Sequence, residues 1–115
     1  MQNRIKSLKK RSDFILLRNN KKKIFGKDIL INYCANKIHQ QTRIGVTVTK
    51  RHGNAVKRNY IKRLLKAVFI KHNKILPSGY DLEFIPKQNE NKIKFLDLEN
   101  DVVTSLKKLN SYISK

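Results

Sequence analysis

The segment from Asn54 to Lys71 constrains the fold more than any other, because its apolar residues recur every three or four positions among cationic ones. That spacing predicts a helix with one core-facing side, which must dock on another layer of the protein. Asn54 is a favourable N-cap residue, and the Gly53 before it is typical of a turn. The residues expected to face the core are Ile61, Leu64, Leu65 and Val68.

The cations of this helix are placed where they oppose its stability. Lys57 and Arg58 lie in the first turn, where the helix dipole already presents positive potential, and each costs about 0.3–1 kcal/mol there. Arg58, Lys62 and Lys66 follow one another at a spacing of four, at which like charges repel. An anionic partner would relieve both effects, and the free N–H groups of a helix start favour phosphate. The pattern therefore predicts a phosphate-binding helix.

The distribution of acidic residues points to the same kind of partner. The chain has 115 residues and a formal net charge of +19, yet no Asp or Glu lies between Asp28 and Asp81. A long acid-free span in a small protein is typical of polyanion binding, with nucleic acid as the first candidate. A surface charged only for solubility would mix both signs. A membrane-surface helix would add a broad exposed apolar face to its basic one.

Length and composition predict one cytoplasmic domain over residues 1–115, with a basic, mobile arm at residues 1–11. No apolar run is long enough to span a membrane, and the N-terminal stretch lacks the apolar centre of a secretory signal. Cys34 is the only cysteine, which excludes an internal disulfide and favours a partly buried, unreactive thiol.

The remaining elements follow from apolar spacing and turn residues. Ser12 is expected to cap a short helix, which leads into a basic loop ending near Gly26. Asp97, Glu99 and Asp101 are interpreted as favourable charges at the start of the last helix. The predicted elements are a helix at 13–18, an antiparallel pair of strands at 29–35 and 43–49, a strand at 80–85 and a C-terminal helix from about 95.

The sequence GNAVKRNYIKRLLK, which follows a strand reading RIGVTVTKR, resembles the signature of the bacterial ribonuclease P protein subunit. KKRSDF resembles the beginning of that family's N-terminal helix, SGYDLEFIPK its last strand and KFLDLENDVVTSLKKL its closing helix. The resemblance therefore covers nearly the whole chain. Three residues depart from the family pattern: Tyr60 stands where an arginine is usual, Arg18 where an aromatic residue is common, and Glu83 where an apolar strand residue is usual.

The resemblance implies an α+β fold: a small two-layer sandwich, like domain 2 of ribosomal protein S5, in which helices pack on one face of a mixed β-sheet with a left-handed βαβ crossover. It also implies the noncatalytic subunit of an endoribonuclease, which assists a catalytic RNA subunit in removing the 5′ leader from precursor tRNA. Mg²⁺ would be bound mainly by that RNA, where it can generate the attacking hydroxide. The implied partners are the ribonuclease P RNA and precursor tRNA, without DNA or a membrane.

The same resemblance assigns RNA-contacting residues to two surfaces. The single-stranded leader would lie in a cleft on the open sheet face, where aromatic and cationic side chains suit unpaired bases. Alternation also places Tyr33 on the strand face of Ile29 and Ile31, which is consistent with a core position instead. The residues expected at the cleft are Phe14, Arg18, Tyr33 and Thr47. The residues expected to bind the RNA subunit are Lys50, Arg51, Asn54, Lys57, Arg58, Asn59, Lys62, Arg63 and Lys66.

Three other functions stay open from the residues alone. A ribosomal or other structural RNA-binding protein would explain the same charge and fold, but it would not need a cleft for a free strand. A DNA-binding regulator is less favoured, because no helix-turn-helix spacing is present. A hydrolase acting alone would need a catalytic set, and neither a Ser-His-acid triad nor a nucleotide-binding loop can be assigned. The three histidines, His39, His52 and His72, lack metal-ligand spacing and are expected at the surface.

Overall fold

The computed structural model describes residues 5–36, 41–87 and 94–114, which form five strands and three α-helices. The strands are β1 (Lys6–Ser7), β2 (Lys23–Phe25), β3 (Ile29–Ala35), β4 (Arg43–Val46) and β5 (Tyr80–Pro86). The helices are α1 (Arg11–Asn19), α2 (Ala55–Lys71) and α3 (Phe95–Ile113), with short 3-10 helices at Lys50–His52 and Asn73–Ile75.

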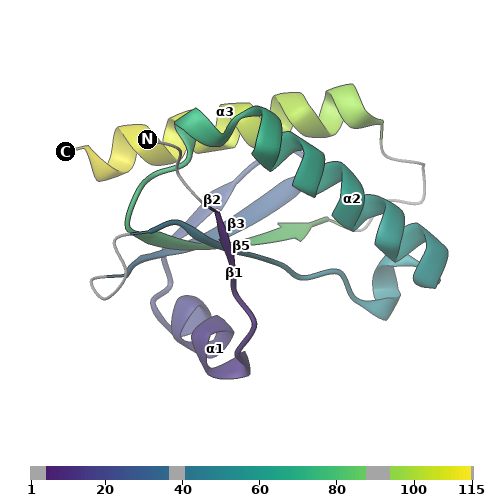
Figure 1. Cartoon of the computed structure of the whole chain (residues 1–115), viewed down its shortest axis with the longest axis horizontal. Coiled ribbons are helices and arrows are strands. Elements are labelled where there is room, and N and C mark those ends of the chain that lie inside the picture. Colours follow the sequence, from purple (N-terminus) through teal and green to yellow (C-terminus); the bar gives the residue numbers. More distant parts are fainter. Residues whose placement is uncertain (1–4, 37–40, 88–93, 115) are drawn as a thin grey trace.

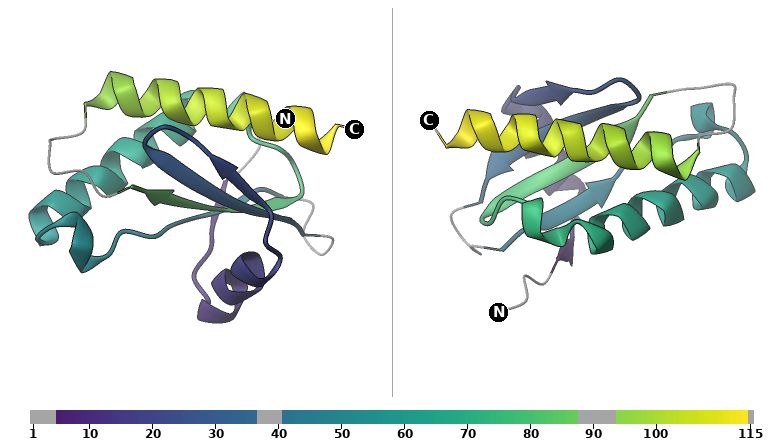
Figure 2. Two further views of the ribbon diagram at one scale, coloured as in Figure 1. Left: turned by 180° about the vertical axis from the view of Figure 1, so that it is seen from behind. Right: turned by 90° about the horizontal axis from the view of Figure 1, so that it is seen from above.

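The strands form one mixed sheet in the order β1-β4-β5-β3-β2. Two helices, α2 and α3, cover one face of the sheet, and the short α1 lies against the other face (Figure 1). Views from behind and from above show α2 and α3 neighbouring each other over the strands (Figure 2). The α+β class and the mixed sheet predicted from the sequence are therefore confirmed.

β5 is a central strand of the sheet, and the predicted pairing of β3 with β4 is wrong. β5 lies between them, antiparallel to β3 and parallel to β4. Its burial explains this position, because Leu82, Glu83 and Phe84 are all fully buried and both faces of the strand are therefore covered. Strands that follow one another in sequence usually pair, and nothing in 29–35 or 43–49 signals that a later strand inserts between them.

The connection from β4 to β5 runs through α2 over one face of the sheet. Seen from the helix side with both strands pointing upward, β5 lies to the left of β4, so the crossover is left-handed (Figure 2). This hand is rare, because right-handed crossovers are the strong rule for parallel neighbours. As a result α2 lies over the β1–β4 side of the sheet, and α3 lies over β2 and β3.

The core lies between the sheet and the two helices that cover it. α2 begins where the sequence predicts, with Asn54 Oδ1 accepting the Lys57 backbone N–H at 3.0 Å. Leu64 is only partly buried, and Phe69 contributes to the core in addition to the predicted residues, with its ring centroid 4.5 Å from that of Phe84. The residues that α2 and α3 bury as apolar rows are Ile61, Leu65, Val68, Phe69, Leu98, Val102, Leu106 and Leu109.

The N-terminal segment differs from its prediction. From residue 5 onward it is not a mobile arm, because β1 pairs in parallel with β4 and Leu8 is buried. α1 begins at Arg11 rather than after Ser12, and its N-cap residue, Lys10, makes no side-chain cap bond. Lys23 belongs to β2, which pairs with β3, rather than to a basic loop. Two strands of two and three residues are too short for a period-two pattern to reveal them.

Candidate RNA-binding surfaces

Four cations of α2 form an exposed basic ridge, which consists of Arg58, Lys62, Arg63 and Lys66. The last three are exposed, as is Asn59 beside them, and Arg58 is half-buried. Within the described residues none of the four cations forms an ion pair, and the buried Nε of Arg58 has no hydrogen-bond partner. The ridge therefore presents positive charge that the fold itself does not compensate.

The other cations predicted to bind the RNA subunit gather at the start of α2. Lys50 and Arg51 are exposed on the 3-10 helix that precedes Gly53. Gly53 has a φ of +121°, and a Cβ on it would lie 2.7 Å from Lys57 Cδ, so only glycine fits this turn. The exposed Asn54 caps the helix, and its side-chain oxygen satisfies one of the free N–H groups. The turn thus brings the predicted residues of 50–57 next to the ridge.

His52 holds this turn against the end of β5. Its ring is buried, with Nδ1 3.0 Å from the Thr49 backbone nitrogen and Nε2 2.6 Å from the Pro86 carbonyl oxygen. Nδ1 can accept from the Thr49 N–H only when Nε2 carries the hydrogen that it donates to Pro86, which assigns the neutral Nε2–H tautomer. The prediction of a surface histidine is wrong for His52, and His39 lies outside the described residues.

A groove of about 640 Å³ separates α2 from the β1–β4 edge of the sheet. Lys62 and Lys66 of the ridge line one side of it, and Ile5, Ile44 and Phe69 are among its apolar lining residues. The sequence did not predict this groove, because its far wall is the short strand β1. Its position extends the ridge toward the N-terminal segment.

The open face is the side of the sheet turned away from α2 and α3, and α1 covers part of it (Figure 1). Strand alternation and pairing decide which side chains reach this face. They include Asn32 and Cys34 of β3, Arg43 and Gly45 of β4, Thr47 just after β4, and Asp81 and Glu83 of β5, and the same alternation places the apolar Leu30 and Ile85 on this face. Unlike the basic ridge, the open face contains acidic side chains.

Tyr33 does not lie on the open face, and its prediction as a cleft residue is wrong. Tyr33 is 9% exposed and belongs to the core cluster with Ile29 and Ile31, as the alternation of the strand also indicated. Its ring centroid lies 6.4 Å from that of Tyr80, and burial raises the pKa of its hydroxyl. The neighbouring Asn32 takes the position on the open face.

Glu83 is fully buried at the centre of the open face and fastens α1 to the sheet. The Arg18 guanidinium donates to both carboxylate oxygens, from Nε at 3.3 Å and from Nη2 at 2.7 Å. Thr47 Oγ1 and Asn32 Nδ2 donate to the same carboxylate. Burial alone would raise the pKa of Glu83, but the hydrogen bonds from these three residues outweigh it and lower the pKa. Two residues that depart from the family pattern, Arg18 and Glu83, are therefore partners.

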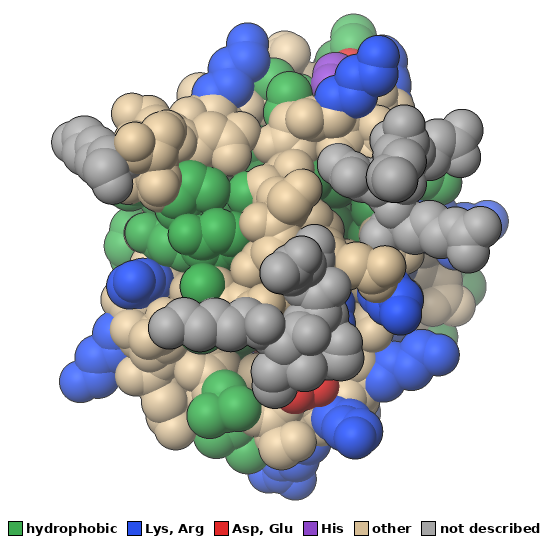
Figure 3. All heavy atoms as spheres, turned by 60° about the vertical axis from the view of Figure 1, so that its left-hand side comes forward, with side chains coloured by type: hydrophobic (Ala, Val, Ile, Leu, Met, Phe, Trp, Pro, Cys, Tyr) green, Lys and Arg blue, Asp and Glu red, His purple; other side chains and the backbone are tan. Residues whose placement is uncertain are grey.

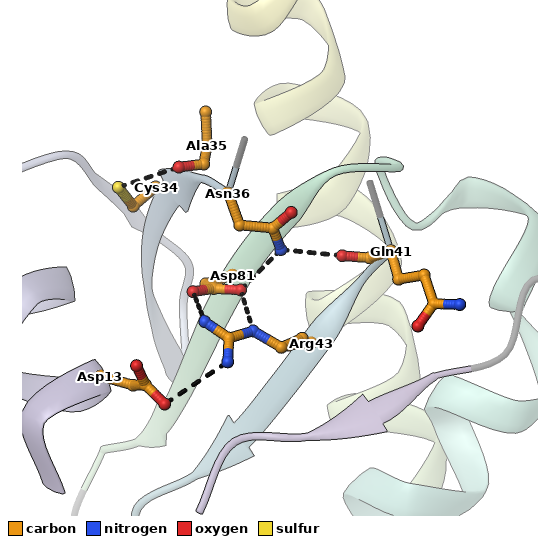
Figure 4. A network of polar contacts seen from close by, with 7 residues as sticks. All are labelled: Asp13, Cys34, Ala35, Asn36, Gln41, Arg43 and Asp81. Carbon is orange, nitrogen blue, oxygen red and sulfur yellow. Dashed lines mark hydrogen bonds and ion pairs between the residues drawn. The ribbon is translucent and has the colours of Figure 1, made fainter. Parts of the chain in front are cut away.

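Arg43 links α1 to the sheet a second time (Figure 4). Its Nε and Nη2 donate to the Asp81 carboxylate at 2.8 and 2.6 Å, and its Nη1 lies 3.4 Å from Asp13 of α1. Asn36 donates to Asp81 as well, at 2.7 Å, and the hydrogen bonds to Asp81 raise the pKa of Arg43. Cys34 is partly buried beside this network, as predicted. Each described acid of α1 and the open face is thus bonded to an arginine.

Phe14 packs against the strand at Gly45. A Cβ on Gly45 would lie 2.4 Å from Phe14 Cε1 and Cζ, so only glycine leaves room for the ring. Phe14 and Thr47 are both half-buried, and Arg18 is exposed. The structure therefore brings three of the four predicted cleft residues together around Glu83.

Two of the three acids of α3, Glu99 and Asp101, connect the helix to other elements, beyond any effect on its dipole. Glu99 accepts from Lys71 Nζ at 2.8 Å and lies 2.7 Å from His72 Nε2, and these hydrogen bonds lower the pKa of Glu99. Asp101 accepts the backbone N–H groups of 27–28 at 2.7 Å each. Their interpretation as helix-start charges was therefore incomplete, and His72 is half-buried rather than a free surface residue.

Basic side chains are more prominent than acidic ones on one face of the molecule (Figure 3). Figure 3 shows a face with Lys and Arg side chains around its margin and little acidic surface. In the described part of the chain, no group of three His, Cys, Asp or Glu side chains is placed to hold a metal ion. None of the described helices is long and apolar enough to cross a bilayer.

Comparison with known proteins assigns the family. The model of the family described as Ribonuclease P matches residues 2–110. The ribonuclease P protein component of Clostridioides difficile strain 630 is 31% identical over 107 residues, which are 92% of this chain and 93% of that protein. That of Helicobacter acinonychis is 39% identical over 72 residues, which are 63% of this chain and only 46% of that protein. The solved structure of Staphylococcus aureus RNase P protein has a TM-score of 0.81 and 28% identity, covering 90% of this chain and 94% of that one. The chain therefore belongs to the ribonuclease P protein family.

Proposed function

We propose that this protein is the RNA-binding subunit of ribonuclease P, which assists a catalytic RNA subunit in removing the 5′ leader from precursor tRNA. Family membership supports a role in tRNA 5′ processing as part of an endoribonuclease. In this proposal the bond-breaking step and its Mg²⁺ ions belong to the RNA, where metal ions can generate hydroxide and stabilise the leaving oxygen. The partners would be ribonuclease P RNA and precursor tRNA in the cytoplasm.

The basic ridge is the observation that carries the proposal. Its four cations lie on one exposed side of α2 without an acidic partner in the described residues, next to the helix start and to Lys50 and Arg51. RNA phosphates would remove the repulsion between these cations and release bound counterions as they do so. The ridge is therefore assigned to the RNA subunit, together with Lys57 and the two asparagines, Asn54 and Asn59.

The open face is assigned to the single-stranded leader. It combines an aromatic ring, Phe14, with the half-exposed side chain of Arg18 and with the half-buried Thr47. Unpaired nucleotides are bound by such mixtures of flat and polar side chains, whereas phosphates of a structured RNA mainly require charge. Tyr33 has no part in this assignment, because its ring belongs to the core.

Reconstitution tests the proposal directly. Purified protein is incubated in Mg²⁺ with precursor tRNA, with and without a bacterial ribonuclease P RNA. The protein alone should leave the substrate uncut, and adding the RNA should produce mature 5′ ends at a rate that the protein raises. The triple variant Arg58→Ala/Lys62→Ala/Lys66→Ala should lose this stimulation, and Lys107→Ala/Lys108→Ala on α3 should keep it. Cleavage by RNA-free protein, with contaminating nuclease excluded, would overturn the proposal.

A competition assay separates this function from that of a structural RNA-binding protein. Labelled precursor tRNA bound to the reconstituted complex is challenged with the leader oligonucleotide or with a structured RNA fragment of equal length. A subunit with a site for the single strand should release precursor tRNA more readily to the leader. A ribosomal or other structural RNA-binding protein should respond more strongly to the structured fragment.

A further inference from the structure

We propose that Arg18 and Glu83 form one base-stacking unit on the open face, in which Glu83 fixes the plane of the Arg18 guanidinium and that plane stacks on an unpaired base of the leader. The inference rests on the proposed function and specifies how this chain would hold its substrate. It concerns a position where the family pattern has an aromatic residue and this chain has a cation.

The carboxylate of Glu83 fixes both the position and the tilt of the guanidinium. Two bonds join the groups side by side, Nε to Oε1 at 3.3 Å and Nη2 to Oε2 at 2.7 Å, and such a bidentate pair is geometrically specific. Glu83 has a side-chain exposure of 0% and is also held by Thr47 and Asn32. Because the carboxylate of Glu83 is held rigidly inside the protein, the plane of the Arg18 guanidinium is fixed before RNA binds.

The Arg18 side chain remains half exposed on the open face. The Arg18 side chain is 50% exposed even though its partner is fully buried. The bond to Glu83 uses two of the five N–H donors and leaves the flat π-face unused. Guanidinium planes stack on unpaired bases much as aromatic rings do, and lysine has no equivalent surface.

The formal charge of the pair favours a base over a phosphate as its ligand. Arg18 and Glu83 together carry no net charge, so the pair attracts a phosphate far less than a free arginine does. Free cations are supplied by the basic ridge, on the opposite side of the sheet. A neutral, planar and half-exposed group is suited to a nucleobase, whose own faces are flat and uncharged.

The departures from the family pattern at 18 and 83 also have a common explanation. In this chain the guanidinium of Arg18 lies on the carboxylate of Glu83 in β5, so the cation at 18 and the acid at 83 depend on each other. Either change alone would leave a buried carboxylate without its cation or a cation without its anchor. The two residues are 65 positions apart in sequence and meet only in the folded protein.

Three variants test the proposal without leaving the buried carboxylate unpaired. Arg18→Ala/Glu83→Gln removes the plane together with the charge beneath it. Arg18→Phe/Glu83→Gln restores a plane without a cation, and Arg18→Lys keeps a cation without a plane. Each is assembled with a bacterial ribonuclease P RNA, and its affinity is measured for a precursor tRNA with a multi-nucleotide leader and for the same tRNA without one. Lys108→Ala on α3 serves as the control, and thermal unfolding confirms that each variant folds.

Stacking predicts that Arg18→Ala/Glu83→Gln and Arg18→Lys lose leader-dependent affinity by about 5- to 150-fold, the range for one stacked base. Arg18→Phe/Glu83→Gln should remain close to the wild type, and the salt dependence of binding should be the same in all of them. If Arg18→Lys binds like the wild type while the phenylalanine variant does not, Arg18 contacts a phosphate and the inference is overturned. Equal affinity in all variants also overturns it, and leaves the proposed function standing. A wild-type complex that does not distinguish the two tRNAs overturns the leader assignment itself.

Discussion

The basic ridge and the open face both carry arginines, and they use them in opposite ways. On the ridge Arg58 and Arg63 have no acidic partner in the described residues. On the open face Arg18 is bonded to Glu83, and Arg43 is bonded to Asp81 and Asp13. An uncompensated cation attracts phosphate over a distance and in any orientation, whereas a bidentate pair is neutral and fixes a geometry.

The two surfaces therefore differ in what their arginines can do: unpaired ones attract an anion, and paired ones hold a fixed geometry. The basic ridge carries cations that the described fold leaves without acidic partners, and their mutual repulsion opposes folding slightly. The acids near α1 and β5 convert the arginines of the open face into structural links between α1 and the sheet. Substitutions should therefore lower stability on the open face and lower RNA affinity on the ridge.

Tyr33→Ala should have the largest effect on stability, because its ring is buried in the core on the side of the sheet opposite the open face. The ring belongs to the core under α2 and α3, and deletion of a buried aromatic side chain costs about 3–5 kcal/mol. Tyr33→Phe, which keeps the ring, should cost about 1 kcal/mol or less. Urea unfolding of both variants measures the difference. A stable Tyr33→Ala variant with weaker binding only to leader-bearing tRNA would return Tyr33 to the open face.

Arg18→Ala should destabilise the protein by about 2 kcal/mol, because it leaves the buried carboxylate of Glu83 without its cation. The half-exposed position of Arg18 moderates the loss, since water can reach the vacated site. The matched variant on the ridge, Arg63→Ala, should stay within about 0.5 kcal/mol of the wild type. Equal unfolding free energies for the two variants would remove the distinction between paired and unpaired arginines.

Acid should weaken the open face through Glu83. The pKa of Glu83 in the folded protein lies below the ordinary value of 4.5, so its contribution to stability is complete above that value and is lost as the pH falls through the folded pKa. From neutral pH to below 4.5, the wild type should therefore lose more stability than Arg18→Ala/Glu83→Gln. Glu99, whose pKa is also lowered, is present in both proteins and cancels in the comparison. Parallel pH profiles would show that the Arg18 bond does not stabilise the charged carboxylate.

The elements that could be predicted from sequence are those whose signal is local. α2, α3 and β5 have long apolar periods, and Asn54 marks the start of α2 by its own hydrogen bond. β1 and β2 have too few residues for such a period, and the place of β5 between β3 and β4 depends on pairings across more than 35 residues of chain. Local patterns therefore gave the elements, while the order of the sheet followed only from the folded protein.

The candidate site divides in the same way. The exposed side of α2 follows directly from helical spacing, so the ridge could be predicted from the sequence. On β3 a shift of one residue moves a side chain to the other face of the strand. The prediction therefore placed Tyr33 on the open face, where the structure has Asn32. The bond between Arg18 and Glu83 cannot be predicted from local pattern either, because the two residues are 65 positions apart in sequence. The burial of His52 was not predictable either, because its partner Pro86 is 34 residues away in sequence and meets it only in the folded protein.

Substitutions on the ridge should have the smallest effect on stability and a large effect on binding. Lys62→Ala should leave the unfolding free energy unchanged or raise it by about 0.2–0.5 kcal/mol, because it removes a like charge from the series with Arg58 and Lys66. Arg58→Ala should gain less, since its half-buried stem also packs against the protein. Each should weaken binding to ribonuclease P RNA and lower the salt slope of binding by about one for a lost phosphate contact. Fluorescence titration over a range of salt, with Lys108→Ala as the control, measures this slope. A clearly lowered melting temperature with unchanged RNA affinity would mean that these cations serve the fold, and the contrast between the ridge and the open face would then be lost.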